Sequence, residues 1–523
     1  MKDPQTILDT VATHKQANQY DQAQCLLLEG INHYPHHTEL RVQLAVTLDA
    51  LGHPQEAINH LQEAVRLHPT SASAHLLLGL ALAQRQESPA AIDHLQRSLA
   101  LSPNLIPAAQ LLADLLVQED RIAEALQFLQ GFVACHPENT DTLLQLGYLY
   151  QHSHQWPKAC FCFEEICRQH PNHPKALQSL GESQGYVGRY DEAIATFQKH
   201  LTLCPKDARS HFNLATLYLL LGNYAEGWPE YSWRKQCGFA ATQYDHPLPG
   251  LLWEGQDLNG QSLFVYSEQG LGDVLQFARY LRLLKARGAT VVVEVQPALQ
   301  RLFQTCPFID TLLVSDPHTP PAIPGKYHAS FLDFPGIFNT TLDTLPSSEN
   351  LLSIPDSWIQ TWHARIPQAP MRVGLVWAGN PKHHQDRFRS CTLEDLTPLA
   401  AIHDIQWISL QKGPAATQQT EVDWELIDVG SQAQDFADTA AVLACLDLVI
   451  TVDTAVAHLA GILGRPVWLL LSYVSDWRWL LDREDSPWYP SIRLFRQSRG
   501  ETWPTVAKRL CAALHAKRAL NTP

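Results

Sequence analysis

The chain has 523 residues, a formal net charge of −15, 45% hydrophobic residues and 17% charged residues. It is too long for a single hydrophobic core, so two or three domains are expected. The acidic balance excludes ordinary nucleic-acid binding, which depends on basic side chains that neutralise phosphates. The first ten residues lack the apolar region of a signal peptide, and no run of about 18 uncharged apolar residues indicates a transmembrane segment. We therefore expect a cytoplasmic protein.

Prolines and small residues recur every 34 positions in the first half of the chain. The prolines are Pro35, Pro69, Pro103, Pro137, Pro171 and Pro205, and the small residues form two further series, Ala23, Ala57, Ala91, Ala125, Ala159 and Ala193, and Ala45, Gly79, Ala113, Gly147, Gly181 and Ala215. A fixed period of this length is typical of stacked pairs of helices. Proline ends each unit because it cannot continue a helix, and small residues allow two helices to approach closely. The sequence therefore predicts an α solenoid.

This pattern resembles the tetratricopeptide repeat and covers roughly the first 235 residues. We expect an array of about seven units over residues 1–236, whose terminal units are less regular because they cap the stack. The resemblance implies a concave groove that recruits a partner peptide or protein. A rigid spacer or a dimerisation module is the alternative interpretation of the array.

Three cysteines, Cys160, Cys162 and Cys167, lie close together within one repeat. On a helix, residues two positions apart point about 200° away from each other, so Cys160 and Cys162 cannot share a metal ion. We expect them to pack in a buried helix face as small apolar side chains.

Three aromatic residues, Trp228, Tyr231 and Trp233, lie at the end of the array. Because such side chains bury large apolar areas, we expect the last repeat to pack against the segment that follows it. The earlier repeats are then left to present a surface to a partner.

The pattern changes after a linker at residues 244–250 that contains prolines. Short β-branched segments then alternate with amphipathic helices in two series, at 262–268, 290–295 and 311–316, and then at 372–379, 405–411, 446–453 and 466–472. Strands that alternate with helices predict parallel sheets covered by helices on both faces. We expect an α/β region of two Rossmann-like domains, at 245–360 and 371–523, with a cleft between them. Ligands bind at the carboxyl ends of such strands.

The first candidate loop is residues 268–273, which read Glu-Gln-Gly-Leu-Gly-Asp and join the first strand to its helix. Gly270 and Gly272 allow a tight turn and leave room for a ligand beside the backbone. Asp273 opens the helix, where the helix dipole favours a carboxylate and is expected to hold its pKa low. The alternative interpretation is an aspartate that only caps its own helix.

The second candidate loop is residues 453–458, which read Asp-Thr-Ala-Val-Ala-His and follow an apolar strand. Free N–H groups at the start of the next helix suit a phosphate, and the Thr454 hydroxyl can add to that site. His458 lies about one and a half turns beyond Asp453, so it need not share the face of the aspartate. A structural histidine is the alternative.

The third candidate loop, at residues 379–389, follows the first strand of the second series. It holds the basic side chains of Lys382, Arg387 and Arg389 in an otherwise acidic chain. Such side chains can bind the oxygens of an anionic ligand. A solvated loop is the alternative.

Together the three loops resemble those of the heptosyltransferase-like glycosyltransferases, which are inverting enzymes of the GT-B architecture with two Rossmann-like domains. The resemblance covers about residues 255–510 and is most specific in GLGDVLQFARYL (270–281) and VITVDTAVAHLAGILGRPVWLLL (449–471). It implies that Asp273 is the catalytic base and that the second Rossmann-like domain, at 371–523, binds the donor. The donor-binding residues that it implies are Gly270, Gly272, Lys382, Arg387, Arg389, Asp453, Thr454, Ala455 and His458. Arg389 stands where the heptosyltransferases carry lysine.

The resemblance implies transfer of a sugar from a nucleotide-diphosphate donor to an acceptor hydroxyl, without a cofactor. Cations and a helix dipole would carry the charge of the departing diphosphate, and no Asp-X-Asp motif occurs in the candidate loops, so no metal is expected. Residues 476–490, DWRWLLDREDSPWYP, are absent from the simple heptosyltransferase pattern and resemble the C-terminal part of tetratricopeptide-repeat proteins with this glycosyltransferase domain. Two alternatives stay open: a non-catalytic scaffold whose α/β region only binds nucleotide, and another enzyme with the same cleft, such as an epimerase or a phosphorylase.

Overall fold

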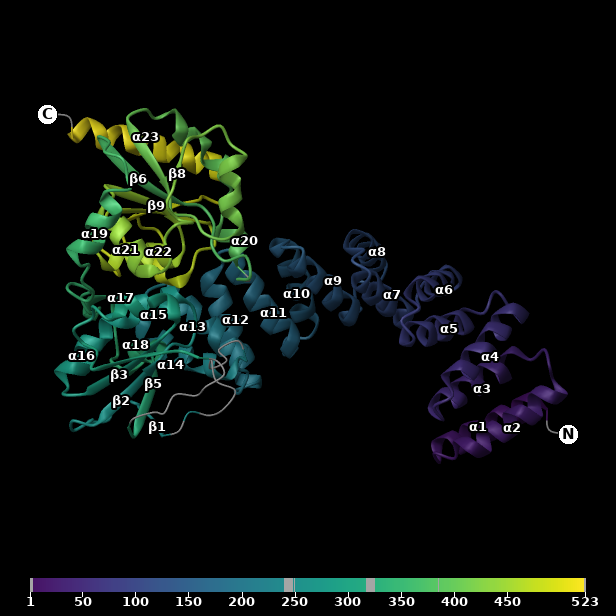
Figure 1. Ribbon diagram of the computed structural model, residues 1–523. Helices are drawn as coiled ribbons and strands as arrows, with labels where there is room; N and C mark the ends of the chain where they lie inside the picture. The colour runs from purple at the N-terminus through teal and green to yellow at the C-terminus, as the bar shows by residue number, and fades with distance from the viewer. Residues whose placement is uncertain (1–2, 239–247, 249, 317–324, 384, 522–523) are drawn as a thin grey trace. The chain divides into compact units, whose positions relative to one another are not determined.

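The computed structural model describes residues 3–238, 248, 250–316, 325–383 and 385–521 (Figure 1). The chain forms two compact units, residues 1–203 and residues 204–523. Within the described residues, the first unit contains helices and turns, and all the strands belong to the second unit.

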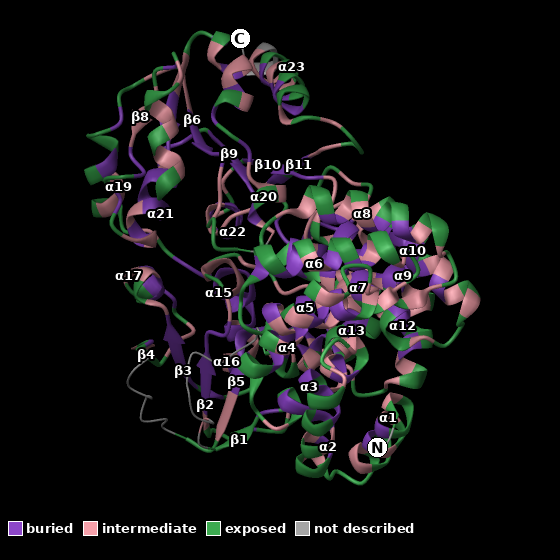
Figure 2. Cartoon of the chain, turned by 90° about the vertical axis from the view of Figure 1, so that its right-hand side faces the viewer, coloured by how far each residue is buried: buried purple, intermediate pink, exposed green. Residues whose placement is uncertain are grey.

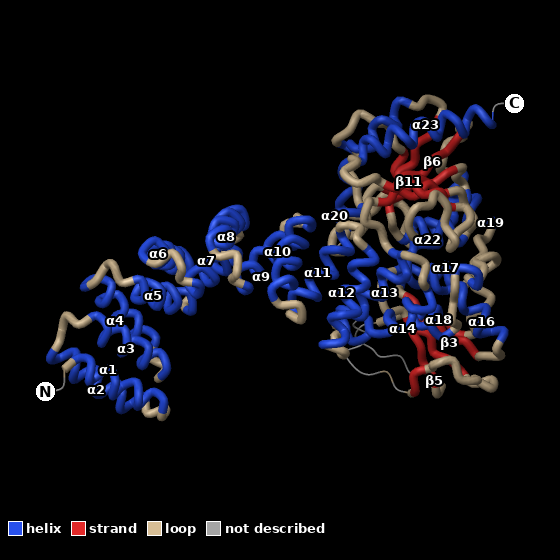
Figure 3. The backbone as a smooth tube through the Cα atoms, turned by 180° about the vertical axis from the view of Figure 1, so that it is seen from behind, coloured by secondary structure: helices blue, strands red, loops and turns tan. Residues whose placement is uncertain are grey.

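The first unit is a solenoid in which a helix of 13 residues alternates with one of 14 residues, as Figure 3 shows in blue. The helices are α1 (Pro4–Gln16), α2 (Tyr20–His33), α3 (Thr38–Ala50), α4 (Pro54–Leu67), α5 (Ala72–Gln84), α6 (Ser88–Leu101), α7 (Ile106–Gln118), α8 (Ile122–Cys135), α9 (Thr140–His152), α10 (Trp156–Gln169), α11 (Pro174–Tyr186) and α12 (Tyr190–Leu203). The recurring prolines lie in the turns that follow the second helix of each pair, as expected.

The recurring small residues lie where the two helices of a pair cross. A Cβ atom on Gly79 would stand 2.9 Å from the Leu95 side chain, and one on Gly147 would stand 2.6 Å from the Phe163 ring. Real Cβ atoms do not approach other atoms so closely, so only glycine fits at these crossings. The 34-residue series therefore marks the closest approach within each helical pair.

Cys160 and Cys162 are both buried in the core of the solenoid. Burial raises the pKa of Cys160 to about 11 and that of Cys162 to about 12. Both thiols are therefore uncharged at neutral pH and pack as apolar side chains, as the sequence predicts.

The seventh helical pair, α13 (Ala208–Leu220) and α14 (Tyr224–Tyr231), belongs to the second unit together with the 3₁₀ helix η1 (Ser232–Gln236). The Trp228 indole donates a hydrogen bond to the Thr340 carbonyl at 2.8 Å, and the Trp488 indole donates one to the Tyr224 hydroxyl at 3.1 Å. Trp477 packs edge-on against Trp228. The aromatic residues at the end of the array thus join its last pair to the α/β part of the chain.

The second unit contains two parallel sheets (red in Figure 3). The first has the strand order β1-β5-β2-β3-β4, and the second has the order β11-β10-β9-β6-β7-β8. The strands are β1 (Leu251–Leu252), β2 (Ser262–Tyr266), β3 (Thr290–Val295), β4 (Thr311–Val314), β5 (Tyr327–Ser330), β6 (Met371–Val376), β7 (Ile405–Ser409), β8 (Ile427–Asp428), β9 (Leu448–Val452), β10 (Val467–Leu471) and β11 (Ile492–Arg496). Figure 2 shows that β2, β3 and β9 are buried along most of their length, which explains their mostly apolar sequences.

Helices and 3₁₀ turns connect the strands. The helices are α15 (Leu271–Phe277), α16 (Leu281–Ala286), α17 (Gln300–Phe303), α18 (Phe334–Ile337), α19 (Asp356–His363), α20 (Asp386–Arg389), α21 (Phe436–Ala444), α22 (Ala455–Ile462) and α23 (Trp503–Asn521), and the 3₁₀ turns are η2 (Ala278–Tyr280), η3 (Pro297–Leu299), η4 (Phe331–Asp333), η5 (Leu342–Thr344), η6 (Glu394–Ala401), η7 (Pro414–Thr420) and η8 (Trp477–Trp479). The 3₁₀ turn η2 interrupts the helix that follows β2 and separates α15 from α16, and there the Arg279 side chain donates to the Gln276 carbonyl. Among the described residues, none of the helices combines the length and the apolar character that crossing a bilayer requires.

Candidate functional site

The turn at residues 268–273 carries Asp273 from the carboxyl end of β2 into α15. The Gly270 N–H donates a hydrogen bond to Asp273 Oδ2 at 2.9 Å, so the carboxylate closes its own turn. This contact fixes one oxygen of Asp273 and leaves Oδ1 to face the second half of the unit. The first candidate loop is therefore a rigid support for one carboxylate oxygen.

Arg478, in η8, occupies that second oxygen. Its Nη2 lies 2.5 Å from Asp273 Oδ1, its Nη1 lies 2.9 Å from Asp476 Oδ1, and its Nε donates to Gln276 Oε1 at 2.5 Å. The arginine side chain is 9% exposed and that of Asp273 is 17% exposed, so both charges are largely removed from water. A buried arginine thus bridges an aspartate of each half.

The sequence-based expectation that the pKa of Asp273 is held low is wrong. Burial of the carboxyl raises its pKa, and Asp476 and Glu268 add to the rise, whereas Arg478 and the Gly270 N–H oppose it. Desolvation of the charged form outweighs both favourable contacts. Asp273 is therefore a more basic carboxylate than a helix-capping aspartate at the surface.

The second candidate loop begins α22 at the carboxyl end of β9. Thr454 is the N-cap residue, but its side chain makes no capping hydrogen bond, and its hydroxyl lies 3.2 Å from that of Thr451. The N–H groups of the first turn of α22, starting at Ala455, therefore have no side-chain cap. They form the positive end of the helix dipole and can donate to another acceptor.

His458 is buried behind that helix start. Its Nδ1 lies 2.9 Å from the Tyr489 hydroxyl, and its ring stacks on Trp479 with a centroid separation of 5.4 Å. Burial, together with the nearby charge of Arg478, lowers the pKa of His458 to about 3. The imidazole is consequently neutral at physiological pH and is held in one orientation.

The first and second candidate loops touch each other. A Cβ atom on Gly272 would stand 2.9 Å from His458 Cδ2 and 3.7 Å from the Ala455 Cα. The space that the sequence reserves beside Gly272 is thus filled by His458, not left for a ligand. Gly272 permits the close approach of the two sheets' carboxyl ends.

The third candidate loop contributes one of its three basic residues to this region. Arg389 Nε lies 3.1 Å from Asp386 Oδ1, and a Cβ on Gly379 would stand 2.7 Å from Arg389 Nη2. Lys382 and Arg387 are exposed. The fold therefore turns Arg389 inwards and leaves the other two at the rim of the loop.

Asp453 lies among these charges. Burial and the nearby Asp476 raise the pKa of Asp453, Arg389 and Arg478 lower it, and the net result is a pKa of about 6. Burial also acts against ionisation of Asp476, but the Arg478 charge outweighs it and lowers the pKa of Asp476. The site thus holds three carboxyl groups and two arginines around a neutral histidine.

A buried ion pair supports the first loop from behind. Arg234 of η1 donates to both oxygens of Glu268, at 2.9 and 2.7 Å, and to Asp333 Oδ1 at 2.7 Å. The Arg234 and Glu268 side chains are 1% and 2% exposed. Since Glu268 is the first residue of the loop that carries Asp273, the last repeat holds that loop in place.

Sequence reasoning named segment 476–490 but assigned no role to Arg478, Asp476 or Tyr489. A local signal exists, because Arg478 lies between two tryptophans, and a charge among aromatic residues needs a buried partner. That partner is Asp273, which lies 205 positions away, so it could not be predicted from the segment itself.

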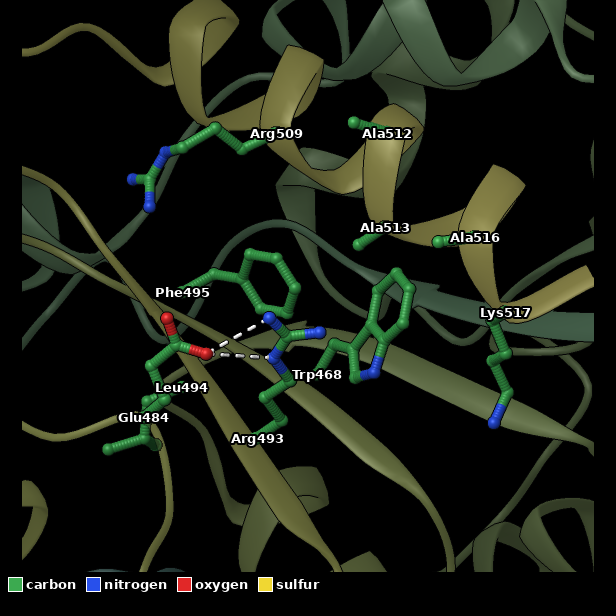
Figure 4. Close-up of a pocket in the computed structure, with 10 residues that line it drawn as sticks. All are labelled: Trp468, Glu484, Arg493, Leu494, Phe495, Arg509, Ala512, Ala513, Ala516 and Lys517. Carbon is green, nitrogen blue, oxygen red and sulfur yellow. Dashed lines mark hydrogen bonds and ion pairs between the residues drawn. The ribbon is translucent and has the colours of Figure 1, made fainter. Parts of the chain in front are cut away.

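Two pockets lie away from the three loops. The first, of about 540 Å³, lies between β11 and α23 and is lined by Trp468, Glu484, Arg493, Leu494, Phe495, Arg509, Ala512, Ala513, Ala516 and Lys517 (Figure 4). The second, of about 710 Å³, lies in the solenoid among α6, α7 and α8 and includes Leu112, Phe128 and Phe132. Neither contains a residue of the candidate loops, and no cluster of His, Cys, Asp and Glu suited to a metal ion occurs in the part of the chain that the structure describes.

Comparison with known proteins identifies the repeats. The tetratricopeptide repeat model matches residues 42–106, and the model of anaphase-promoting complex, cyclosome, subunit 3 matches residues 152–229. The N-terminal part of the chain is therefore a tetratricopeptide-repeat solenoid.

Among individual proteins, the chain is 28% identical to Protein FlbA of Caulobacter vibrioides over 383 residues, which cover 67% of this chain and 63% of FlbA. It is 32% identical over 83 residues to the peroxisomal targeting signal receptor of Saccharomyces cerevisiae, covering 16% of this chain and 14% of that receptor. The match thus spans less than two thirds of either relative. Among solved structures, YrrB, a TPR protein with an unusual peptide-binding site, is 18% identical, with a TM-score of 0.32 and coverage of 35% of this chain and 95% of YrrB.

Proposed function

We propose that the chain is an inverting, metal-independent glycosyltransferase that moves a sugar from a nucleotide-diphosphate donor to an acceptor hydroxyl. The observation that carries this proposal is the meeting of two strand-to-helix turns at the carboxyl ends of two parallel sheets, where Gly272 contacts His458 and Asp273 pairs with Arg478. Ligands of open α/β sheets bind at this end of the strands. In the proposed enzyme, the two sheets are the two Rossmann-like domains of a GT-B fold.

The residues present suit the chemistry of inverting transfer. Asp273 would take the proton of the acceptor hydroxyl as its oxygen forms a bond to the anomeric carbon. The bond from that carbon to the diphosphate would break, and the leaving group would depart with the electron pair. The uncapped start of α22, the Thr454 hydroxyl and Arg389 would take up the added negative charge.

The repeat array would recruit the acceptor or a partner protein. Its similarity to the peroxisomal targeting signal receptor supports a protein partner. The FlbA match covers 67% of this chain. This share is larger than the part up to the end of η1 and larger than the part after it, so the match includes residues of both the repeats and the α/β part.

One observation favours a second candidate, a nucleotide-binding scaffold without catalysis. Both oxygens of Asp273 are engaged, Oδ2 by the Gly270 N–H and Oδ1 by Arg478. An acceptor hydroxyl would therefore have to compete with Arg478 for Oδ1 before Asp273 could take its proton.

Two measurements on the full-length chain separate these candidates. Thermal stabilisation by UDP, GDP, ADP and CDP at millimolar concentration tests nucleotide binding, and release of sugar from the corresponding donors tests turnover. We expect stabilisation by one diphosphate and slow hydrolysis of its sugar donor, lost in Asp273→Asn with binding retained. Binding without hydrolysis by the wild type would favour the scaffold, and the absence of both would refute a nucleotide site.

A further inference from the structure

Arg478 has all three kinds of guanidinium nitrogen engaged by protein. Nη2 contacts Asp273, Nη1 contacts Asp476, and Nε contacts Gln276. Asp476 Oδ1 also accepts a hydrogen bond from the Arg478 backbone N–H at 3.0 Å. The arginine is thus anchored twice by Asp476, and its contact with Asp273 is the one that can be given up while the side chain stays in place.

We propose that Arg478 is exchanged between Asp273 and the donor diphosphate, so that binding of the donor releases the base. Without donor, Arg478 Nη2 covers Asp273 Oδ1. With donor, the same nitrogen turns to the phosphate oxygens and Asp273 Oδ1 becomes free. The inference rests on the proposed function, to which it adds a residue and an order of events.

The position of Arg478 relative to the phosphate site supports the exchange. Its neighbour Trp479 stacks on His458, and His458 lies in α22, whose start is uncapped. Arg478 and Arg389 both lower the pKa of Asp453 and of His458, so the two cations lie near the same pair of residues. A diphosphate carries more negative charge than one carboxylate, so the Nη2 group forms stronger charge-assisted hydrogen bonds with its oxygens than with Asp273.

The charges around Asp273 determine what the exchange does. The acidic neighbours Asp476 and Glu268 raise the pKa of Asp273, and the cation Arg478 lowers it. The nearby hydroxyls of Tyr231 and Tyr489 are uncharged, because burial raises the pKa of both. Withdrawal of Arg478 leaves Asp273 with acidic and neutral neighbours, which makes it a stronger base. In the transfer step, the acceptor proton passes to Oδ1, the acceptor oxygen bonds to the anomeric carbon, and the electron pair of the broken bond leaves with the diphosphate that Arg478 now contacts.

The test uses full-length Arg478→Gln, with Arg483→Gln as control, because Arg483 pairs with Asp485 at the surface. Calorimetry with the diphosphate that stabilises the wild type should show at least about tenfold weaker binding for Arg478→Gln and unchanged binding for the control. Hydrolysis of the matching sugar donor is then followed from pH 4.5 to 8.

The pH profiles of kcat/KM and of kcat should shift by different amounts. The acid limb of kcat/KM reports the free enzyme, in which Arg478 covers Asp273, so it should move to higher pH in Arg478→Gln. The acid limb of kcat reports the donor complex, in which Arg478 has already left, so it should move less. Equal movement of both limbs, or no movement with unchanged affinity, would overturn the exchange while leaving the proposed function standing. A wild type that neither binds a diphosphate nor hydrolyses a donor would refute both.

Arg478→Lys serves if the glutamine variant does not fold. It keeps the charge, but its single nitrogen cannot contact Asp476, Gln276 and the diphosphate together as the arginine does, so diphosphate affinity should fall while the acid limb of kcat/KM stays near that of the wild type. An affinity equal to that of the wild type would count against the exchange.

Discussion

Gly272→Ala tests the contact between the two halves without removing any polar group. The new methyl would stand 2.9 Å from His458 Cδ2. His458 cannot move aside easily, because Tyr489 holds its Nδ1 and Trp479 stacks on its ring. Adding a methyl to a packed contact of this kind costs about 1–3 kcal/mol.

That cost translates into binding. If the diphosphate binds only when the two turns touch, a penalty of about 1–3 kcal/mol lowers its affinity by roughly 5-fold to 150-fold. Calorimetry of the full-length chain measures this directly. Gly131→Ala is the matched control, because Gly131 also lies in a helix and no atom lies within 4 Å of its added methyl.

A double-mutant cycle identifies the source of the effect. His458→Ala removes the ring that the new methyl meets, so Gly272→Ala should cost less in that background than in the wild type. An equal cost in both backgrounds, or an affinity of Gly272→Ala equal to that of the wild type, would refute the contact between Gly272 and His458 on which the site is built.

Other parts of the molecule give four further predictions. In the solenoid, Gly147→Ala should lower the thermal midpoint, because its methyl would stand 2.6 Å from the buried Phe163 ring. Gly131→Ala should raise the thermal midpoint, because alanine favours a helix more than glycine does and no atom lies within 4 Å of its methyl, so a fall in both midpoints would contradict the crossing geometry. Arg389→Ala should weaken diphosphate binding by about tenfold or more, and the exposed Lys382→Ala should weaken it less, so the reverse order by calorimetry would move the phosphate contact to the rim. The pKa of His458 is lowered to about 3, so below about pH 6.5 its imidazole binds a proton in the unfolded chain but not in the folded chain, and the free energy of unfolding of the wild type falls by about 1.4 kcal/mol per pH unit. The difference in melting temperature between the wild type and the less stable His458→Gln should therefore narrow from pH 7 to pH 4.5, and a constant difference would show that the imidazole titrates normally. Removal of residues 1–203 should leave a folded fragment that still binds diphosphate. Removal of residues 1–236 should give an insoluble fragment, because the loss of Arg234 leaves Glu268 buried and unpaired at a cost of about 3–5 kcal/mol. A soluble, diphosphate-binding fragment from the longer deletion would mean that the last repeat is dispensable.

The solenoid could be predicted from sequence almost residue by residue, because its determinants are local and repeated. Each proline marks a turn, and each small residue marks a crossing, so the 34-residue period alone indicates the packing role of Gly79 and Gly147. The division of the chain at residue 203 could not be predicted in the same way. The last helical pair has the same period as the others, and only its aromatic side chains distinguish it.

The candidate loops were also recognisable, because glycines, an aspartate and an uncapped helix start have local sequence signatures. What the sequence could not provide was the balance of charges among them. Asp273 lies where a helix dipole favours a carboxylate, yet burial by the second half of the unit raises its pKa. Burial of this kind depends on side chains more than 200 positions away, such as Arg478.

The three buried arginines of the second unit show how its parts depend on one another. Arg234 ties the last repeat to Glu268, Arg478 ties η8 to Asp273, and Arg279 donates to the Trp488 carbonyl from η2. Each bond joins the neighbourhood of the first loop to a different segment, and loss of any of these partners would leave a buried charge less well compensated. The loop that carries Asp273 is therefore held at its first residue by the repeat and at its last residue by the C-terminal half. In the proposed exchange, Oδ2 stays fixed by the Gly270 N–H when Arg478 leaves Oδ1, so the carboxyl group can take up the acceptor proton without changing its position.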